Sequence, residues 1–185
     1  KQYISQEKID FIDKFNDGQF SNEDEIIEYA KNHSIGSKKY PTVIYDEEYY
    51  DAIEKWQDEG DVLVHMLQSG KPFKNPKTKR YAESLLRDLE MAMGEYTTTE
   101  DIVVYRVVRS EYRYDRSDYF VSVTTSPEKA AIFGSDTKGA KIQAFLIPKG
   151  TPAIVVGNNH QSQFEMIFNS AYIDFEKCML RKYRK

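Results

Sequence analysis

Residues 121–168 read VSVTTSPEKAAIFGSDTKGAKIQAFLIPKGTPAIVVGNNHQSQFEMIF and carry the patterns that decide the fold. They contain two short stretches with the pattern of β-strands, a hydroxyl-rich turn, and Glu165 two residues after Gln163. Residues two apart on a strand lie on the same face. We therefore expect Gln163 and Glu165 to point one way, and Phe164, Met166 and Phe168 the other. Polar groups with such apolar backing could form one wall of a site.

Before this segment, the spacing of apolar residues changes at Ile102. It goes from a repeat of about 3.6 residues, which is typical of helices, to a repeat of 2 residues, which is typical of strands. The expected helices cover residues 4–15, 21–32, 46–58, 61–68 and 80–92, with Gly60 as an interruption and a basic loop over 71–79. The expected strands cover residues 102–109, 119–124, 141–147, 151–155, 164–168 and 171–178, with a brief helix over 127–133. A run of helices followed by a run of strands predicts an α+β fold.

Length and composition limit the possible classes of protein. A chain of 185 residues is long enough for one domain, so we expect a single unit over residues 1–185, mainly helical to residue 98 and mainly strands from 99. The net charge of −4 gives no general reason to expect a polyanionic partner. One cysteine, Cys178, excludes an internal disulfide and a cysteine-based zinc cluster, and no apolar stretch is long enough to span a membrane.

Three local features follow one another along the chain. Arg106 stands late in one expected strand, Thr124-Thr125-Ser126 ends another before a short helix, and Gln163-Phe164-Glu165 opens a later one. Each has an ordinary explanation: a solvated or ion-paired arginine, a helix N-cap, and the wet face of a sheet. Their combination in this order is much harder to attribute to coincidence.

In these features, residues 46–178 resemble the bacterial mono-ADP-ribosyltransferase exoenzymes, especially the clostridial Rho-modifying type. Those enzymes share an Arg, a Ser-Thr-Ser strand and a Gln/Glu-x-Glu motif in this order, and the flanking stretches MGEYTTTEDIVVYR, AIFG and FLIPKGT match as well. The resemblance implies a helical lobe followed by a mixed or antiparallel β-sandwich core. It also implies NAD as co-substrate, a macromolecular acceptor, and a toxin that is secreted or delivered to act in the cytosol of a target cell.

The resemblance also implies roles for individual residues. Glu165 corresponds to the catalytic carboxylate, which hydrogen-bonds the ribose 2′-hydroxyl and stabilises the positive charge of an oxocarbenium-like transition state. Arg106 offers a planar cationic fork for the pyrophosphate. Thr125, with its neighbours Thr124 and Ser126, is expected to brace Glu165 and line the nicotinamide side. Nicotinamide leaves as a neutral group, so no metal is required, and the three scattered histidines offer no metal site.

Gln163 is the residue implied to orient the acceptor. In the resemblance, an amide at this position goes with asparagine-like, threonine or guanine acceptors, and a glutamate goes with arginine. We therefore expect a non-arginine acceptor, and we favour a protein acceptor over a nucleic acid. The basic residues in the range 71–80 leave a nucleic-acid acceptor possible.

The sequence departs from the pattern of the resemblance in several places. Thr124 stands where those enzymes have a serine, and His160 or a neighbour stands where the Rho-modifying enzymes have an aromatic residue. Val64 and Gln68 occupy the places of an asparagine and an arginine that contact the cofactor phosphate. Residues 134–140 form either a loop that closes over the ligand or a simple surface turn.

Two other functions stay open at this point. The chain could hydrolyse NAD with water as the acceptor, which makes it an NAD glycohydrolase. It could also be a non-catalytic binding or adaptor domain that keeps the fold, as in one half of the enzyme component of binary toxins.

Overall fold

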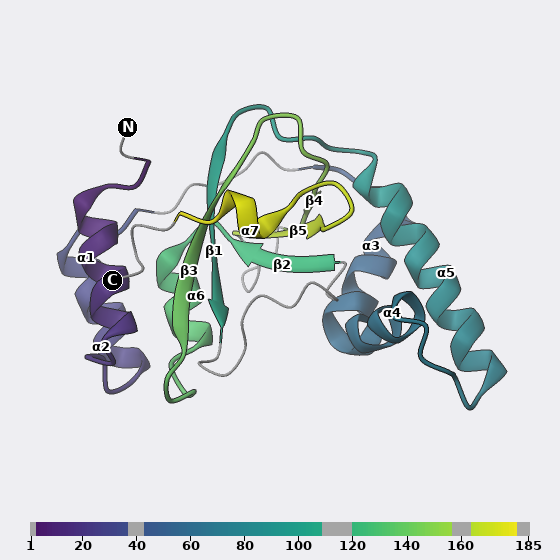
Figure 1. Cartoon of the computed structure of the whole chain (residues 1–185), viewed down its shortest axis with the longest axis horizontal. Coiled ribbons are helices and arrows are strands. Elements are labelled where there is room, and N and C mark those ends of the chain that lie inside the picture. The colour runs from purple at the N-terminus through teal and green to yellow at the C-terminus, as the bar shows by residue number, and fades with distance from the viewer. Residues whose placement is uncertain (1–2, 37–42, 109–119, 157–163, 181–185) are drawn as a thin grey trace.

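The computed structural model of the protein describes residues 3–36, 43–108, 120–156 and 164–180 (Figure 1). Six helical segments precede the first strand: α1 (Gln6–Asn16), α2 (Glu23–Asn32), α3 (Glu47–Lys55), the π-helical turn η1 (Trp56–Gly60), α4 (Asp61–Gln68) and α5 (Pro76–Met93). Then follow β1 (Ile102–Val108), β2 (Phe120–Thr124), α6 (Pro127–Phe133), β3 (Lys141–Ile147), β4 (Ile154–Val155), β5 (Glu165–Asn169) and α7 (Phe175–Cys178). The α+β class expected from the sequence is confirmed.

The described strands form one antiparallel sheet in the order β3-β1-β2-β5-β4. The pairing of β1 with β3 extends from Ile102↔Ile147 to Val108↔Lys141, whereas β1 and β2 share the single pair Tyr105↔Thr124. Figure 1 shows β2 and β5 running across the direction of β1 and β3. The sheet therefore consists of two halves joined at a narrow junction.

The two halves of the sheet enclose a common apolar core. Val104 of β1 and Phe145 of β3 come from one half, and Val123, Met166 and Phe168 come from the other; all five are buried in the same cluster. The sandwich expected from the resemblance is thus made by two halves of one bent sheet. Burial of apolar surface on both inner faces stabilises this bend.

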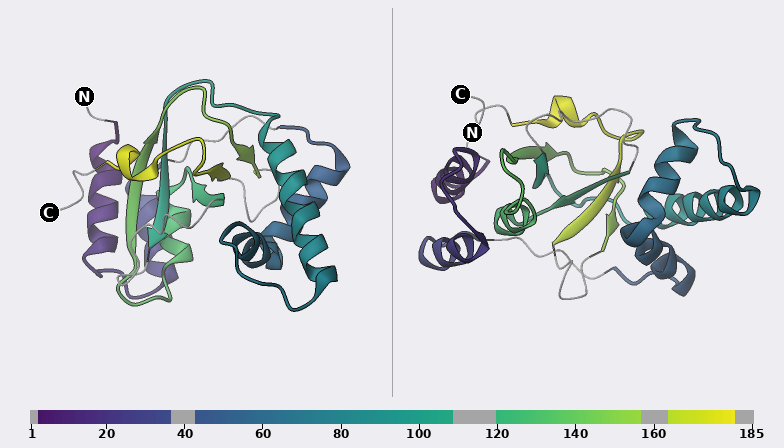
Figure 2. Two further views of the ribbon diagram at one scale, coloured as in Figure 1. Left: turned by 45° about the vertical axis from the view of Figure 1, so that its right-hand side comes forward. Right: turned by 90° about the horizontal axis from the view of Figure 1, so that it is seen from below.

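The helices lie in two groups on opposite sides of the sheet (Figure 2). Helices α1 and α2 pack with α6 and β3, through an apolar cluster that includes Phe11, Ile26 and Ala131. Helices α3, α4 and α5 pack with one another, and their cluster reaches Ile154 of β4 and Ile167 of β5. The first 98 residues thus contribute two helical groups, and only the second forms a lobe beside β5.

None of the described helices is long and apolar enough to cross a membrane.

The C-terminal segment differs from the expectation. A strand over residues 171–178 is wrong, because the structure has a short helix, α7, in its place. The Asp174 side chain accepts a hydrogen bond from the Lys177 amide at 3.3 Å and caps this helix. Phe175 is buried in edge-to-face contact with Phe145. The segment is too short for its pattern to separate a strand from one turn of helix.

Helix α5 begins earlier than expected. It starts at Pro76 instead of residue 80, because the Asn75 side chain accepts from the Lys77 amide at 2.9 Å and proline suits the first helical position. Lys77 and Lys79, expected in a loop, therefore stand on the first turn of a helix.

Gly60 was expected to interrupt the helices, yet α3, η1 and α4 are continuous. The Asp61 amide donates to the Trp56 carbonyl, which is the i→i+5 bond of a π-helical turn. Gly60 is buried against α5, and a Cβ there would lie 2.4 Å from Leu85 Cδ2 and 2.7 Å from the Lys55 carbonyl oxygen. A glycine is needed here for close packing of two helices, not for a turn.

We expect Gly60→Ala to lower the free energy of unfolding by about 1–3 kcal/mol, the usual cost of overpacking. Urea denaturation monitored by circular dichroism measures this change. Gly36→Ala is the matched control, because nothing lies within 4 Å of a Cβ at Gly36. Equal stability of the two variants would contradict the packing role of Gly60.

Candidate functional site

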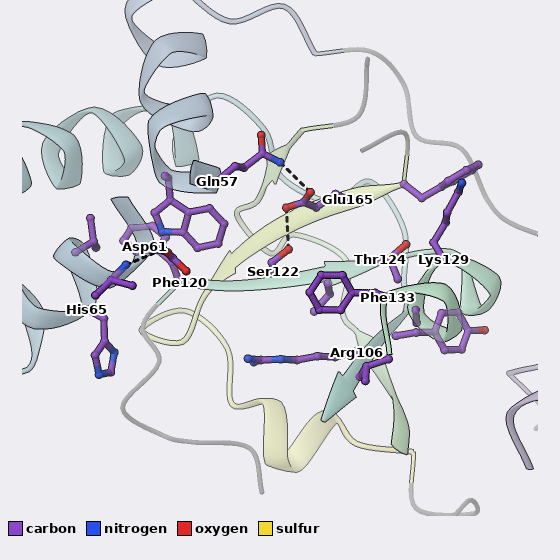
Figure 3. A pocket seen from close by; sticks show the side chains of 18 of the residues that line it. Gln57, Asp61, His65, Arg106, Phe120, Ser122, Thr124, Lys129, Phe133 and Glu165 are labelled. Carbon is purple, nitrogen blue, oxygen red and sulfur yellow. Dashed lines mark hydrogen bonds between the residues drawn. The ribbon is translucent and has the colours of Figure 1, made fainter. Parts of the chain in front are cut away.

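A cleft of about 710 Å³ opens between the α3–α5 group and the sheet, at the junction of β1 and β2 (Figure 3). This volume lies within the range of small-molecule binding sites. The cleft is lined by Trp56, Gln57, Asp61, Val62, Val64, His65, Gln68, Tyr105, Arg106, Val107, Phe120, Ser122, Val123, Thr124, Lys129, Ala130, Phe133, Phe164 and Glu165.

Glu165 is the first residue of β5 and pairs with Thr124 of β2. Its side chain lines the cleft, while Met166 and Phe168 are buried in the core on the other face, as the alternation predicts. Phe164, expected with these two, lines the cleft instead, because it precedes β5 and the alternation of the strand does not extend to it. Ser122 Oγ donates to Glu165 Oε1 at 2.8 Å, and Gln57 Nε2 donates to Glu165 Oε2 at 2.9 Å (Figure 3). Each carboxylate oxygen is thus held by a different donor. One comes from the sheet, and the other comes from the side of the cleft formed by η1 and the α3–α5 group, called the helical wall below.

Opposing effects act on the acidity of Glu165. Burial raises the pKa of its carboxyl group, and the hydrogen bonds from Ser122 and Gln57 lower it. Burial has the largest effect, so the pKa lies above the ordinary value of a glutamate. Raised pKa values of this kind are common at functional sites, because catalysis often uses groups in partly desolvated surroundings.

The hydroxyl groups of the Thr-Thr-Ser run are arranged differently from the expectation. Thr124 lines the cleft, and its Oγ1 accepts from the Ser126 amide at 3.1 Å. Ser126 is buried and caps α6 by accepting from the Lys129 amide at 3.1 Å. Thr125 is also buried, and its amide donates to the Phe164 carbonyl at 3.0 Å.

The hydroxyl contact with Glu165 that was assigned to Thr125 comes from Ser122. Successive residues on β2 point to opposite faces, so Ser122 shares the face of Thr124 and Thr125 does not. The alternation VSVT could have identified Ser122 from the sequence, because it puts Ser122 and Thr124 on one side and two valines on the other.

Arg106 lies on β1, opposite Gln143 of β3, and extends its side chain into the cleft (Figure 3). Arg106 is half-buried and lies across the cleft from the helical wall. Lys129, on the first turn of α6, is a second cation in the lining. The lining of the cleft therefore carries two cations on the sheet side, Arg106 and Lys129, and two carboxylates, Glu165 on the sheet and Asp61 on α4, although the chain as a whole is acidic.

The helical wall supplies residues that the sequence did not single out as a site. Gln57 on η1, and Asp61 and His65 on α4, line the cleft. Gln68 stands one turn further, and within the described part of the chain its buried Oε1 has no hydrogen-bond partner. A buried acceptor on a cleft wall is suited to a donor group of a ligand.

Two large apolar side chains stand exposed in the lining of the cleft, on opposite walls. Phe133 at the end of α6 is 83% exposed and Val62 on α4 is 61% exposed. An exposed aromatic ring in the lining of a cleft offers a surface on which a planar group can stack.

Several expected features are not placed or not brought to the cleft. Gln163 and His160 lie outside the described residues, as does the rest of the loop over 158–163. Residues 134–140 form turns after α6, and their closure over a ligand stays a prediction. Among the described residues, no three His, Cys, Asp or Glu side chains are grouped as metal ligands.

Comparison with known proteins finds relatives of one kind. No protein-family model matches the chain. The NAD(+)--arginine ADP-ribosyltransferase EFV of Enterococcus faecalis (strain ATCC 700802 / V583) is 31% identical over 103 residues, which are 51% of this chain and 21% of that protein. The chain thus spans about a fifth of the length of this relative.

Among similar solved structures, an ADP-ribosylating toxin shows the same fold over about two thirds of this chain. The ADP-ribosylating toxin BECa of a C. perfringens binary enterotoxin, solved with NADH, matches with a TM-score of 0.51 at 16% identity, over 67% of this chain and 36% of that one. The Clostridium limosum C3 exoenzyme matches with a TM-score of 0.49 at 13% identity, over 81% of this chain and 83% of that one. The resemblance to bacterial mono-ADP-ribosyltransferases is therefore confirmed, in sequence over half of the chain and in fold.

We expect Ser122→Ala to raise the pKa of Glu165, because a hydrogen bond to the charged form is lost. Titration of the carboxyl group by carbon NMR measures this change. Ser135→Ala is the control, since Ser135 donates to the Ile132 carbonyl and does not line the cleft. An unchanged Glu165 titration in Ser122→Ala would show that this contact is not made in solution.

Proposed function

We propose that this chain is an NAD-dependent mono-ADP-ribosyltransferase that transfers ADP-ribose to a macromolecular acceptor and releases nicotinamide. The observation that carries the proposal is Glu165, a carboxylate held through both oxygens in a cleft of suitable size. The sequence relative and the fold of an ADP-ribosylating toxin support the same reaction.

The proposed reaction breaks the bond between C1′ of the ribose and the ring nitrogen of nicotinamide. The electron pair of this bond stays on nicotinamide, which becomes neutral, and positive charge develops on the ribose C1′ and ring oxygen. Glu165 would stabilise this charge and hydrogen-bond the 2′-hydroxyl. The acceptor nucleophile then bonds to C1′ and loses a proton.

Other residues in the lining are suited to hold NAD. Arg106 offers a bidentate fork for the pyrophosphate, and Lys129 adds a second positive charge. The exposed ring of Phe133 gives a stacking surface for a planar ring, and the buried Gln68 Oε1 can accept from an amino group. Thr124 would line the nicotinamide side, while Thr125 and Ser126 would act by fixing the backbone behind it.

Two acceptor classes follow from different observations. Gln163 in the Gln-x-Glu motif favours a non-arginine residue, or guanine, as the acceptor. The relative in Enterococcus faecalis is named for transfer to arginine, which makes arginine a second candidate. We propose a protein acceptor and a toxin-like route of delivery to a target cell, because the relatives in solved structures are named toxins.

Isotope-labelled NAD separates transfer from the alternatives. The protein is incubated with labelled NAD and a cell lysate, and modified peptides are located by mass spectrometry. Label on a macromolecule supports transfer, and the modified residue identifies arginine, another side chain or a nucleic acid. Free labelled ADP-ribose alone identifies an NAD glycohydrolase, and no NAD binding by calorimetry favours the non-catalytic domain.

We expect Glu165→Gln to lower the rate of NAD cleavage by at least about 10²- to 10³-fold, the usual cost of removing one group that stabilises transition-state charge. Binding of NAD should be retained, because glutamine keeps the size and polarity of the side chain. Nicotinamide release measures the rate and calorimetry the binding. Glu90→Gln on the exposed side of α5 is the control; full activity in Glu165→Gln would refute the role of Glu165.

A further inference from the structure

Gln57 reaches the carboxylate of Glu165 from a part of the chain that none of the sequence motifs includes. Its Nε2 lies 2.9 Å from Glu165 Oε2, and the two residues are 108 positions apart in the chain. Within the described cleft, this is the side-chain hydrogen bond that joins the helical wall to Glu165, while Ser122 binds the other oxygen from the sheet.

The backbone beneath Gln57 is a π-helical turn, η1, which is a rare conformation that is frequently found at functional sites. The extra residue of a π-helical turn changes the direction of the side chains that follow it. Trp56 is buried in the core of the helical group and Gly60 packs directly on Leu85, so the turn is anchored on both sides of Gln57. Gln57 itself is not packed in the core but exposed to the cleft.

We propose that Gln57 is a positioning residue for Glu165, delivered by the π-helical turn Trp56–Gly60, and that it aligns the carboxylate with the reacting ribose. This inference rests on the proposed function, because the carboxylate needs alignment only if NAD is cleaved at it. A free glutamate side chain samples many rotamers, and donors to both oxygens select one. A carboxylate has about four lone-pair sites, so Gln57 and a ribose hydroxyl can bind it together.

The amide of Gln57 is suited to this task because it is neutral. A lysine or arginine in its place would also hold the carboxylate, but its charge would cancel the negative charge that the oxocarbenium-like state requires. The charged or titratable groups that line the cleft with Glu165 are Asp61 and His65 on α4, Tyr105 and Arg106 on β1, and Lys129 on α6. The pKa of Glu165 nevertheless depends on burial first, and then on the bonds from Ser122 and Gln57.

The test compares Gln57→Leu and Gln57→Lys in the full chain. The acid limb of the pH profile of kcat for nicotinamide release reports the ionisation of Glu165 in the complex with NAD. In Gln57→Leu a hydrogen bond that lowers the pKa of Glu165 is lost, so the acid limb should move to higher pH by about one pH unit. The kcat at neutral pH should fall about tenfold. In Gln57→Lys a positive charge is added, so the acid limb should move to lower pH, while kcat should still fall.

The controls separate positioning from a merely structural role. Gln6→Leu makes the same substitution on the exposed face of α1. Gln6 does not line the cleft, so this variant should leave the pH profile unchanged. Thermal unfolding shows whether each variant is folded. A loss of stability or of helix packing would not move the acid limb in opposite directions in the two Gln57 variants.

Each outcome bears on the inference. Opposite shifts in Gln57→Leu and Gln57→Lys support it, and a fall in kcat with an unmoved acid limb overturns it. If the wild-type chain cleaves no NAD, the proposed function fails. The carbon NMR titration of Glu165 then still tests whether Gln57 binds its carboxylate. An identical Glu165 pKa in the wild type and in Gln57→Leu then shows that Gln57 does not bind the carboxylate.

Discussion

The single residue pair between β1 and β2, Tyr105↔Thr124, determines where the cleft lies. Where strands pair over their whole length, side chains of neighbouring strands cover each other and leave little room. Here the sheet bends at one pair, because both of its halves bury their inner faces in one apolar core. The bend separates Arg106 on β1 from Glu165 on β5, and the space between them becomes the floor of the cleft.

The second wall depends on the division of the helices into two groups. Helices α1 and α2 support the β3 side of the sheet, so that α3, α4 and α5 are left to cover β4 and β5. This places η1 over the start of β5, where Gln57 meets Glu165. The carboxylate is thereby bound by two parts of the fold, and its geometry depends on how the helical group sits on the sheet.

Most of the elements could be predicted from the sequence, because their apolar periods were clear. The helix Pro127–Phe133 and the strand Lys141–Ile147 have the expected bounds. Two of the failures have local causes. A side-chain cap turned the last expected strand into α7, and a capped Pro76 began α5 early. Gly60 was misread because the pattern of one chain cannot show a neighbouring helix at contact distance.

The sequence by itself determined the fold class, the face on which Glu165 points, and the likeness to ADP-ribosyltransferases, because strand alternation and motif order are properties of the chain. The tertiary structure alone decided which groups touch the carboxylate. Ser122 replaced Thr125 as the hydroxyl donor, and Gln57 came from a helix far away in the sequence. Contacts of this kind depend on the packing of whole elements, since a bend in the sheet and a π-helical turn set distances that no local pattern contains.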